Sequence, residues 1–142
     1  MLHKVFIAIL CLGMLAGIGQ TQDKVGSVEG KWETRQKDEG GKSVRSVKEH
    51  KDGQTTLTRY DEKGEVVSQH QSQYKLRKTD EVRIFTYSNV EVTKGPNKGQ
   101  KAAGPFSYAF RIQDDSFYEF HGVLLGDSGA PRLVIWTRVK EK

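Results

Sequence analysis

Three histidines, His50, His70 and His121, are the residues beyond the apolar amino terminus that are best suited to metal or acid–base chemistry. Glu119 stands two positions before His121, so on a strand both would share one face and could meet His70 across a closed sheet. Two imidazoles and a carboxylate form a possible metal set. Residues on separate strands are more often unrelated, so we predict neither a metal ion nor a cofactor.

The segment Gly126-Asp127-Ser128-Gly129 resembles the nucleophile loop of trypsin-like proteases, and it would make Ser128 a nucleophile. A catalytic triad also needs a histidine base and an orienting aspartate, and in that family both precede the serine. His50 lacks the surrounding sequence of that base, and the mature chain is too short for a two-barrel protease. We interpret the segment as a turn in which glycine supplies a positive φ, and we predict no catalytic residue.

The amino terminus has the three-part plan of a secretory signal peptide. A basic start is followed by an apolar run from Val5 to Leu15 and then by small residues up to Gly19. A membrane-spanning helix needs about 20 apolar residues, and this run is shorter. We therefore expect a signal peptide over residues 1–19, a linker over 20–27 and one domain over 28–142. An uncleaved amino-terminal anchor is the alternative.

The single cysteine, Cys11, lies inside the apolar run and follows Ile9 and Leu10 instead of the small residues of a lipoprotein signal. The mature chain then has no thiol, which excludes disulfides, thiol catalysis and cysteine-based metal sites. An exported domain without disulfides fits a bacterial envelope or secreted protein. We expect a secreted or periplasmic protein without an integral membrane segment after cleavage.

Alternating residues followed by turn clusters recur along the rest of the chain, and no stretch keeps apolar residues at helical spacing. The predicted strands span residues 30–36, 43–49, 55–60, 66–77, 82–92, 106–112, 117–124 and 133–139. Their mostly short connections, rich in Gly and Asp, require antiparallel neighbours. Eight such strands most simply close into an all-β, antiparallel up-and-down barrel, which removes exposed edges. A two-sheet β-sandwich remains the alternative, because periodicity does not separate the two folds.

Two predicted strands indicate what such a barrel would enclose. One face of residues 66–77 alternates apolar, hydroxyl and imidazole side chains, whereas one face of residues 106–112 is aromatic. Apolar walls with a few polar groups are typical of small-molecule pockets. The predicted ligand-binding residues are His70, Ser72, Tyr74, Phe106, Tyr108 and Phe110. The alternative is that Ser68, His70 and Ser72 face water on a half-exposed strand.

Gly30-Lys31-Trp32 and Arg138 stand in the first and last predicted strands. They resemble the arrangement of lipocalins, a calycin-type family, in which a Gly-x-Trp opens the barrel and an arginine packs over the indole by cation–π contact. The ending from Leu133 to Lys140 is also similar to small exported lipocalin-like bacterial domains. The resemblance implies structural roles for Gly30, Trp32 and Arg138 and an apolar ligand inside the barrel. The chain departs from larger lipocalins in having no disulfide and no helix beside its last strand.

The positive charge of the chain is concentrated in one segment. The formal charge of +5 falls to +4 when Lys4 leaves with the signal peptide, and Lys94, Lys98, Lys101 and Arg111 account for that excess. A nucleic-acid-binding protein would carry a basic stripe with exposed aromatic residues over a broad face, so we predict no nucleic-acid partner. The basic segment is either a cationic lip that attracts an anionic ligand or simply a soluble loop.

The loop over residues 94–104 faintly resembles a phosphate loop. Its glycines, Gly95 and Gly99, are separated by three residues instead of four, and the lysine is displaced. We interpret it instead as a flap beside the mouth of the barrel or a solvated hairpin tip.

These observations predict an exported, monomeric, non-enzymatic lipocalin-like barrel that binds a small apolar or amphipathic ligand, with an anionic ligand as one option. One alternative is a structural or interaction module of the cell envelope with a filled barrel. Another is a weak hydrolase or isomerase with its site around His70. An open cavity would favour ligand binding, whereas a packed interior would favour the structural module.

Overall fold

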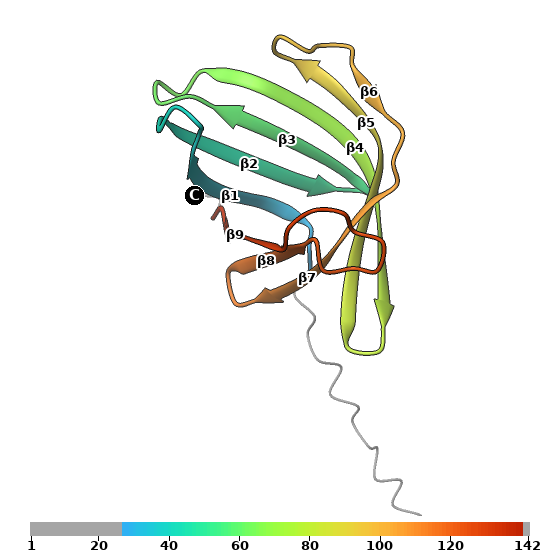
Figure 1. The fold of residues 1–142 in the computed structure, drawn as a ribbon. Helices are drawn as coiled ribbons and strands as arrows, with labels where there is room; N and C mark the ends of the chain where they lie inside the picture. Colours follow the sequence, from blue (N-terminus) through green and yellow to red (C-terminus); the bar gives the residue numbers. More distant parts are fainter. Residues whose placement is uncertain (1–26, 141–142) are drawn as a thin grey trace, which may run out of the picture.

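Nine β strands form one continuous antiparallel sheet in the computed structural model, which describes residues 27–140 (Figure 1). The strands are β1 (Gly30–Lys37), β2 (Ser43–Lys51), β3 (Gln54–Tyr60), β4 (Val66–Thr79), β5 (Val82–Lys94), β6 (Lys101–Ala102), β7 (Phe106–Gln113), β8 (Ser116–His121) and β9 (Arg132–Arg138). Each long strand pairs with its neighbour in the chain, and β1 also pairs with β9. The sheet therefore closes on itself as the predicted eight-stranded up-and-down barrel, which is consistent with a lipocalin-like fold.

The ninth strand, β6, is a correction to the predicted loop over residues 94–104. Val90 and Glu91 of β5 pair with Ala102 and Lys101 of β6, and the same strand β5 pairs farther along with β7. Residues 95–100 thus form the tip of a hairpin that extends beyond the barrel wall (Figure 1). Turn-forming glycines mark this tip in the sequence but do not reveal the short pairing that follows it.

The two ends of the barrel differ in how their strands are connected. At one end, two-residue turns join β2 to β3, β4 to β5 and β7 to β8, and their first residues, Asp52, Asp80 and Asp114, have φ near +50°. Aspartate tolerates this left-handed conformation, which suits tight hairpins. The opposite end carries the longer connections, including residues 38–42, 61–65 and 122–131. We call this second end the mouth.

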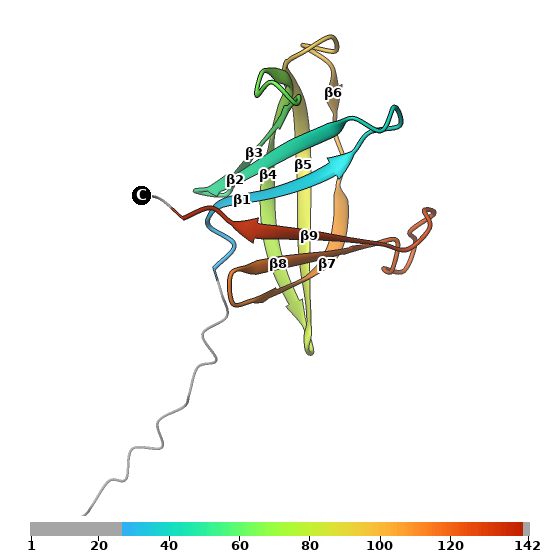
Figure 2. The same cartoon turned by 90° about the vertical axis from the view of Figure 1, so that its left-hand side faces the viewer.

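The seam between β1 and β9 is the shortest pairing that closes the barrel. Only Trp32 with Arg138 and Glu33 with Thr137 are paired there, whereas β1 pairs with β2 along its whole length. Figure 2 shows β1 and β9 diverging from this point. The barrel is consequently tight at its closed end and wider toward the mouth.

The predicted signal peptide, residues 1–19, and all of the predicted linker except Ser27 lie outside the described residues. Within residues 27–140, no helix is long and apolar enough to cross a membrane.

Candidate functional site

A cavity of about 240 Å³ occupies the half of the barrel that faces the mouth. Its wall combines aromatic and aliphatic side chains with hydroxyl, imidazole and charged groups, and the residues come from every long strand. The lining residues are Thr34, Gln36, Ser46, Lys48, Thr55, Leu57, Arg59, His70, Ser72, Phe85, Tyr87, Tyr108, Glu119, His121, Arg132, Val134 and Trp136. Gln36, Arg59 and Arg132 are exposed, so the cavity reaches the surface at the mouth.

The closed end is sealed by Trp32, which has no exposed surface. Its indole nitrogen donates to the carbonyl of Val28 at 2.8 Å, and the Arg138 guanidinium lies 3.9 Å from the ring centroid. Arg138 also donates to the carbonyls of Glu29 and Ser27 at 3.0 and 2.9 Å. A guanidinium stacked on an indole covers the ring while keeping its own hydrogen bonds.

Gly30 makes room for this seal. Its φ is +108°, and a Cβ atom there would lie 3.1 Å from a guanidinium nitrogen of Arg138. The positive φ favours glycine at this position, and a Cβ atom would also displace the arginine from its close approach. The structure brings Gly30, Trp32 and Arg138 together as the lipocalin resemblance implies.

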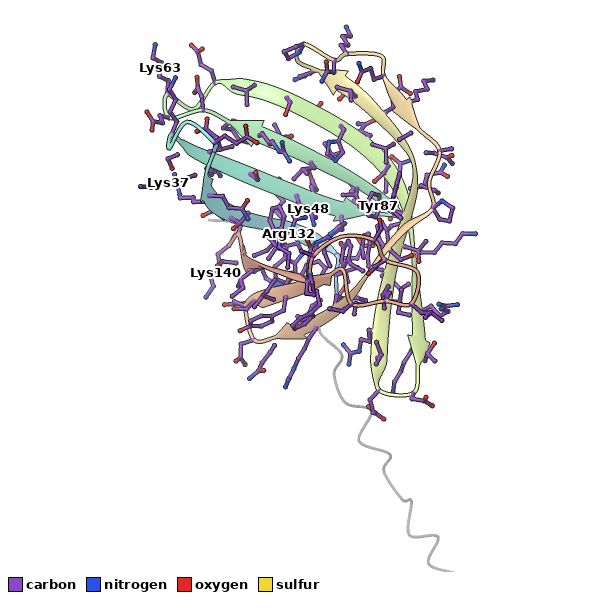
Figure 3. The ribbon with its side chains drawn as sticks, in the orientation of Figure 1. Lys37, Lys48, Lys63, Tyr87, Arg132 and Lys140 are labelled. Carbon is purple, nitrogen blue, oxygen red and sulfur yellow. The ribbon has the colours of Figure 1, made fainter. Side chains whose placement is uncertain are left out.

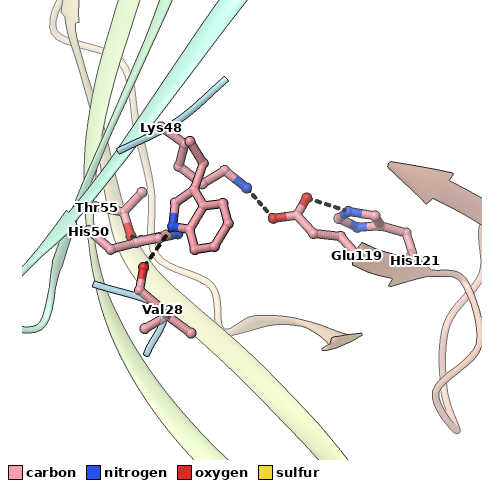
Figure 4. A network of polar contacts seen from close by, with 7 residues as sticks. Val28, Lys48, His50, Thr55, Glu119 and His121 are labelled. Carbon is pink, nitrogen blue, oxygen red and sulfur yellow. Dashed lines mark hydrogen bonds and ion pairs between the residues drawn. The ribbon is translucent and has the colours of Figure 1, made fainter. Parts of the chain in front are cut away.

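The floor of the cavity contains a buried ion pair between Lys48 and Glu119 (Figure 4). Glu119 also contacts the Nε2 atom of His121 at 3.2 Å and accepts a hydrogen bond from Tyr108. The Lys48 ammonium lies 4.2 Å from the centroid of the Trp136 ring, a cation–π distance. The two buried charges are therefore compensated by each other, by the contacts of His121 and Tyr108 with Glu119, and by the Trp136 ring beside Lys48.

The protonation states of this pair follow from its surroundings. Burial would raise the pKa of Glu119, but the Lys48 charge and the hydrogen bonds from His121, Lys48 and Tyr108 outweigh burial and lower that pKa to about 2. Burial lowers the pKa of Lys48, and the attraction of Glu119 opposes that change. The carboxylate is therefore ionised at neutral pH, and together with Lys48 it adds no net charge to the cavity.

His50 lies below the cavity floor, among the rings of Tyr74, Phe85 and Phe117. Its Nδ1 atom is 2.7 Å from the Thr55 hydroxyl, whereas Nε2 has no hydrogen-bond partner in the described part of the chain. Burial and the nearby Lys48 charge lower the pKa of His50 to about 3, and Glu119 opposes the change. This imidazole is accordingly neutral, and it acts as a packing element of the core.

Two arginines and a histidine line the upper part of the cavity. Arg59 of β3 lies between Ser46 of β2 and Ser68 of β4 in the strand register, and Arg132 of β9 is paired with His121 of β8. Burial lowers the pKa of the half-buried His70, and the charges of Arg59 and Lys48 lower it further. In Figure 3, Lys48, Tyr87 and Arg132 lie toward the interior, whereas Lys37, Lys63 and Lys140 extend outward.

Three of the six predicted ligand-binding residues line the cavity, and the other three, Tyr74, Phe106 and Phe110, do not. His70, Ser72 and Tyr108 are part of the cavity wall, so that face of β4 points into the barrel. Tyr74 and Phe110 lie outside the cavity wall, and both pack into the aromatic core near the closed end. Phe106 is 42% exposed and packs against Tyr87 at a centroid distance of 5.3 Å.

The sequence reasoning missed the charged residues of the cavity, above all Lys48, Arg59 and Arg132. Lysine and arginine usually lie on surfaces, so their types alone give no signal of an inward position. A signal was present in the hairpin register, because Lys48 stands directly opposite the buried Trp32. Paired residues of neighbouring strands share one face of a sheet, so an inward Trp32 requires an inward Lys48.

The remaining chemical candidates form neither a catalytic triad nor a metal site within residues 27–140. Ser128 is exposed in the 122–131 connection, while His50 is enclosed in the core. Glu119 and His121 are in contact and share the cavity with His70. Even so, no group of three histidines or carboxylates within residues 27–140 is arranged to hold a metal ion.

Comparisons of the chain with protein-family models, with curated proteins and with solved structures gave no match.

Proposed function

We propose that the protein is an exported, non-enzymatic binding protein that holds a small amphipathic organic molecule in its barrel cavity. The observation that carries this proposal is the cavity itself, which opens at the mouth and is not filled by side chains. Its volume lies just below the range usual for small-molecule sites, so it suits a small ligand with a limited apolar part.

The composition of the wall supports an amphipathic ligand over a purely apolar one. Phe85, Tyr108, Val134 and Trp136 offer apolar surface, and burial of such surface drives the binding of an apolar group. The hydroxyl groups of Thr34, Ser46, Thr55 and Ser72 stand among them.

The indole nitrogen of Trp136 adds a second reason. It is buried and has no hydrogen-bond acceptor in the described part of the chain, although Trp136 belongs to the cavity wall. A buried donor without an acceptor costs about 1–3 kcal/mol, so a ligand that supplies an acceptor there would recover part of that cost.

The proposal can be tested with N-phenyl-1-naphthylamine, a neutral probe whose fluorescence rises in an apolar site. We expect saturable binding by the wild-type protein and loss of binding in Val134→Trp, because the larger ring would fill the cavity. Ile135→Trp is the matched control, since Ile135 precedes Trp136 on the same strand but is 48% exposed on the outer face. Far-UV circular dichroism would verify that both variants fold.

Native mass spectrometry of the protein purified from its own host gives an independent measurement. We expect a bound organic molecule that Val134→Trp no longer carries. If the wild-type protein binds neither the probe nor a molecule from its host, the barrel is a structural module and the proposal is wrong.

A further inference from the structure

We propose that the ligand carries one anionic group, which Arg59 and Arg132 bind at the mouth of the cavity. This inference rests on the proposed function, since it specifies the chemical class of the molecule that the cavity takes. It arises from the charges that line the cavity and from their positions along its depth.

The cavity has an excess of positive charge at its mouth. Glu119 is the one carboxylate in its wall, and that carboxylate is paired with Lys48 at the floor. Arg59 and Arg132 also line the cavity, and neither has an ion-pair partner within residues 27–140. Two guanidinium groups in the upper wall, where no carboxylate of the cavity wall is left to balance them, create a site that favours an anion.

The surroundings of each arginine leave its donors available. In the strand register Arg59 stands between Ser46 and Ser68, which are neutral. Arg132 stands opposite His121, whose Nε2 atom contacts Glu119. A carboxylate, sulfonate or phosphate oxygen can accept two parallel hydrogen bonds from a guanidinium, which is the strongest geometry for such a contact.

The depth of the cavity sets the orientation of the ligand. The arginines lie at the exposed mouth, whereas Trp136 and Tyr108 lie buried at the floor. The anionic group therefore stays at the mouth, where part of its hydration is kept, and the apolar part enters the barrel. In the reverse orientation the anionic group would be buried beside Glu119, and the negative charge of that carboxylate would repel it.

The lysine-rich hairpin tip is a weaker candidate for the same role. Lys101 already forms an ion pair with Glu91 at 3.3 Å on the β5–β6 hairpin, and its side chain is 70% exposed. Lys94, Lys98 and Lys101 are not among the residues of the cavity wall. These lysines can raise the local concentration of an anion, but the contacts within the cavity come from the arginines.

Two probes that share one ring system test the inference. The first is 8-anilinonaphthalene-1-sulfonate, and the second is the neutral N-phenyl-1-naphthylamine, which lacks the sulfonate. We expect the wild-type protein to bind both. Arg59→Gln and Arg132→Gln should each weaken sulfonate binding about tenfold, as expected for the loss of one charged hydrogen-bonding contact, and should change neutral-probe binding less than about twofold. Arg111→Gln, on the outer face of β7, is the matched control and should alter neither.

The outcomes separate the inference from the function on which it rests. If the wild-type protein binds the neutral probe but not the sulfonate, or if the double variant Arg59→Gln/Arg132→Gln keeps sulfonate affinity, the anion site is wrong and the cavity function stands. If neither probe binds, the proposed function itself fails. Added sodium chloride should weaken only sulfonate binding, because salt screens charge and leaves apolar contacts intact.

Discussion

At the scale of single residues, the interior of this barrel is defined by charges that a hydrophobic core would normally exclude. Lys48 and Glu119 compensate each other, and Tyr108, His121 and the Trp136 ring complete their surroundings. A buried ion pair of this kind adds little net stability compared with apolar residues of the same volume, because desolvation offsets the attraction. Under the proposed function, the pair would instead offer polar surface to a ligand at the cavity floor.

His50 gives the protein a pH dependence that can be predicted in sign. The pKa of His50 in the folded protein is about 3, below the ordinary value of 6.5. Between these two pH values the unfolded chain binds a proton at His50, whereas the folded chain does not. The contribution of neutral His50 to the free energy of unfolding is therefore fully present above pH 6.5, and it is lost as the pH falls toward 3. Between pH 6.5 and 4.5 we expect the free energy of unfolding to fall by up to about 1.4 kcal/mol per pH unit, as measured by urea titration.

A substitution isolates the contribution of His50. His50→Phe keeps an aromatic ring in the core and removes the titrating group, so the free energy of unfolding should lose most of its slope in this pH range. His70→Asn should reduce the slope less, because His70 is only half-buried. Glu119 does not affect the slope in this range. Its pKa falls from the ordinary 4.5 to about 2 on folding, so its contribution to the free energy of unfolding is lost only below pH 4.5. An unchanged slope in His50→Phe would contradict this account.

At the scale of elements, the sequence predicted the barrel, its strands and three residues of the cavity wall, but not the charged residues of that wall. The strands followed from alternation and from Asp- and Gly-rich turns, which are local signals. The short strand β6 was missed because its pairing with β5 depends on the hairpin over residues 95–100. Arg59 and Arg132 were missed because their inward positions depend on the register of several strands at once.

The seam between β1 and β9 is the element-scale feature with the clearest dynamic consequence. Residues 34–37 of β1 and 132–136 of β9 each have a strand partner on one side only, whereas residues 83–87 of β5 are paired on both sides. Opening at strand edges needs fewer contacts to be broken. We therefore expect amides of these two edges to exchange with deuterium faster than those of β5, as measured by hydrogen-exchange mass spectrometry.

A bound ligand should reduce the difference in exchange rate between the seam edges and β5. Both edges contribute to the cavity wall, through Thr34, Gln36, Arg132 and Val134, so a ligand that contacts them should slow their exchange. The β4–β5 hairpin at the closed end, around Asp80, serves as the internal reference and should not change. Equal exchange of the seam and the centre of β5 in the free protein would show that the edges are protected by contacts other than strand pairing.

At the scale of the whole molecule, the two ends of the barrel differ in their connections and in the side chains that they carry. The closed end combines two-residue turns with the Trp32 and Arg138 seal. The mouth combines longer connections with the exposed Arg59 and Arg132. Along the cavity wall, the charge changes from the paired Lys48 and Glu119 at the floor to the two arginines at the opening.

Intrinsic tryptophan fluorescence should report the closure of the barrel during folding. The chain has two tryptophans, and both Trp32 of β1 and Trp136 of β9 are buried beside the seam that joins the ends of the chain. Hairpins such as β4–β5 form from local contacts, whereas the β1–β9 pairing must bring together residues more than 100 positions apart. We expect native tryptophan fluorescence to return with the slowest phase of refolding seen by far-UV circular dichroism, in milliseconds to seconds. Trp32→Phe should leave Trp136 reporting the same phase. Recovery of native fluorescence while much of the circular dichroism change is still missing would show that the seam forms early, and that the hairpins follow it.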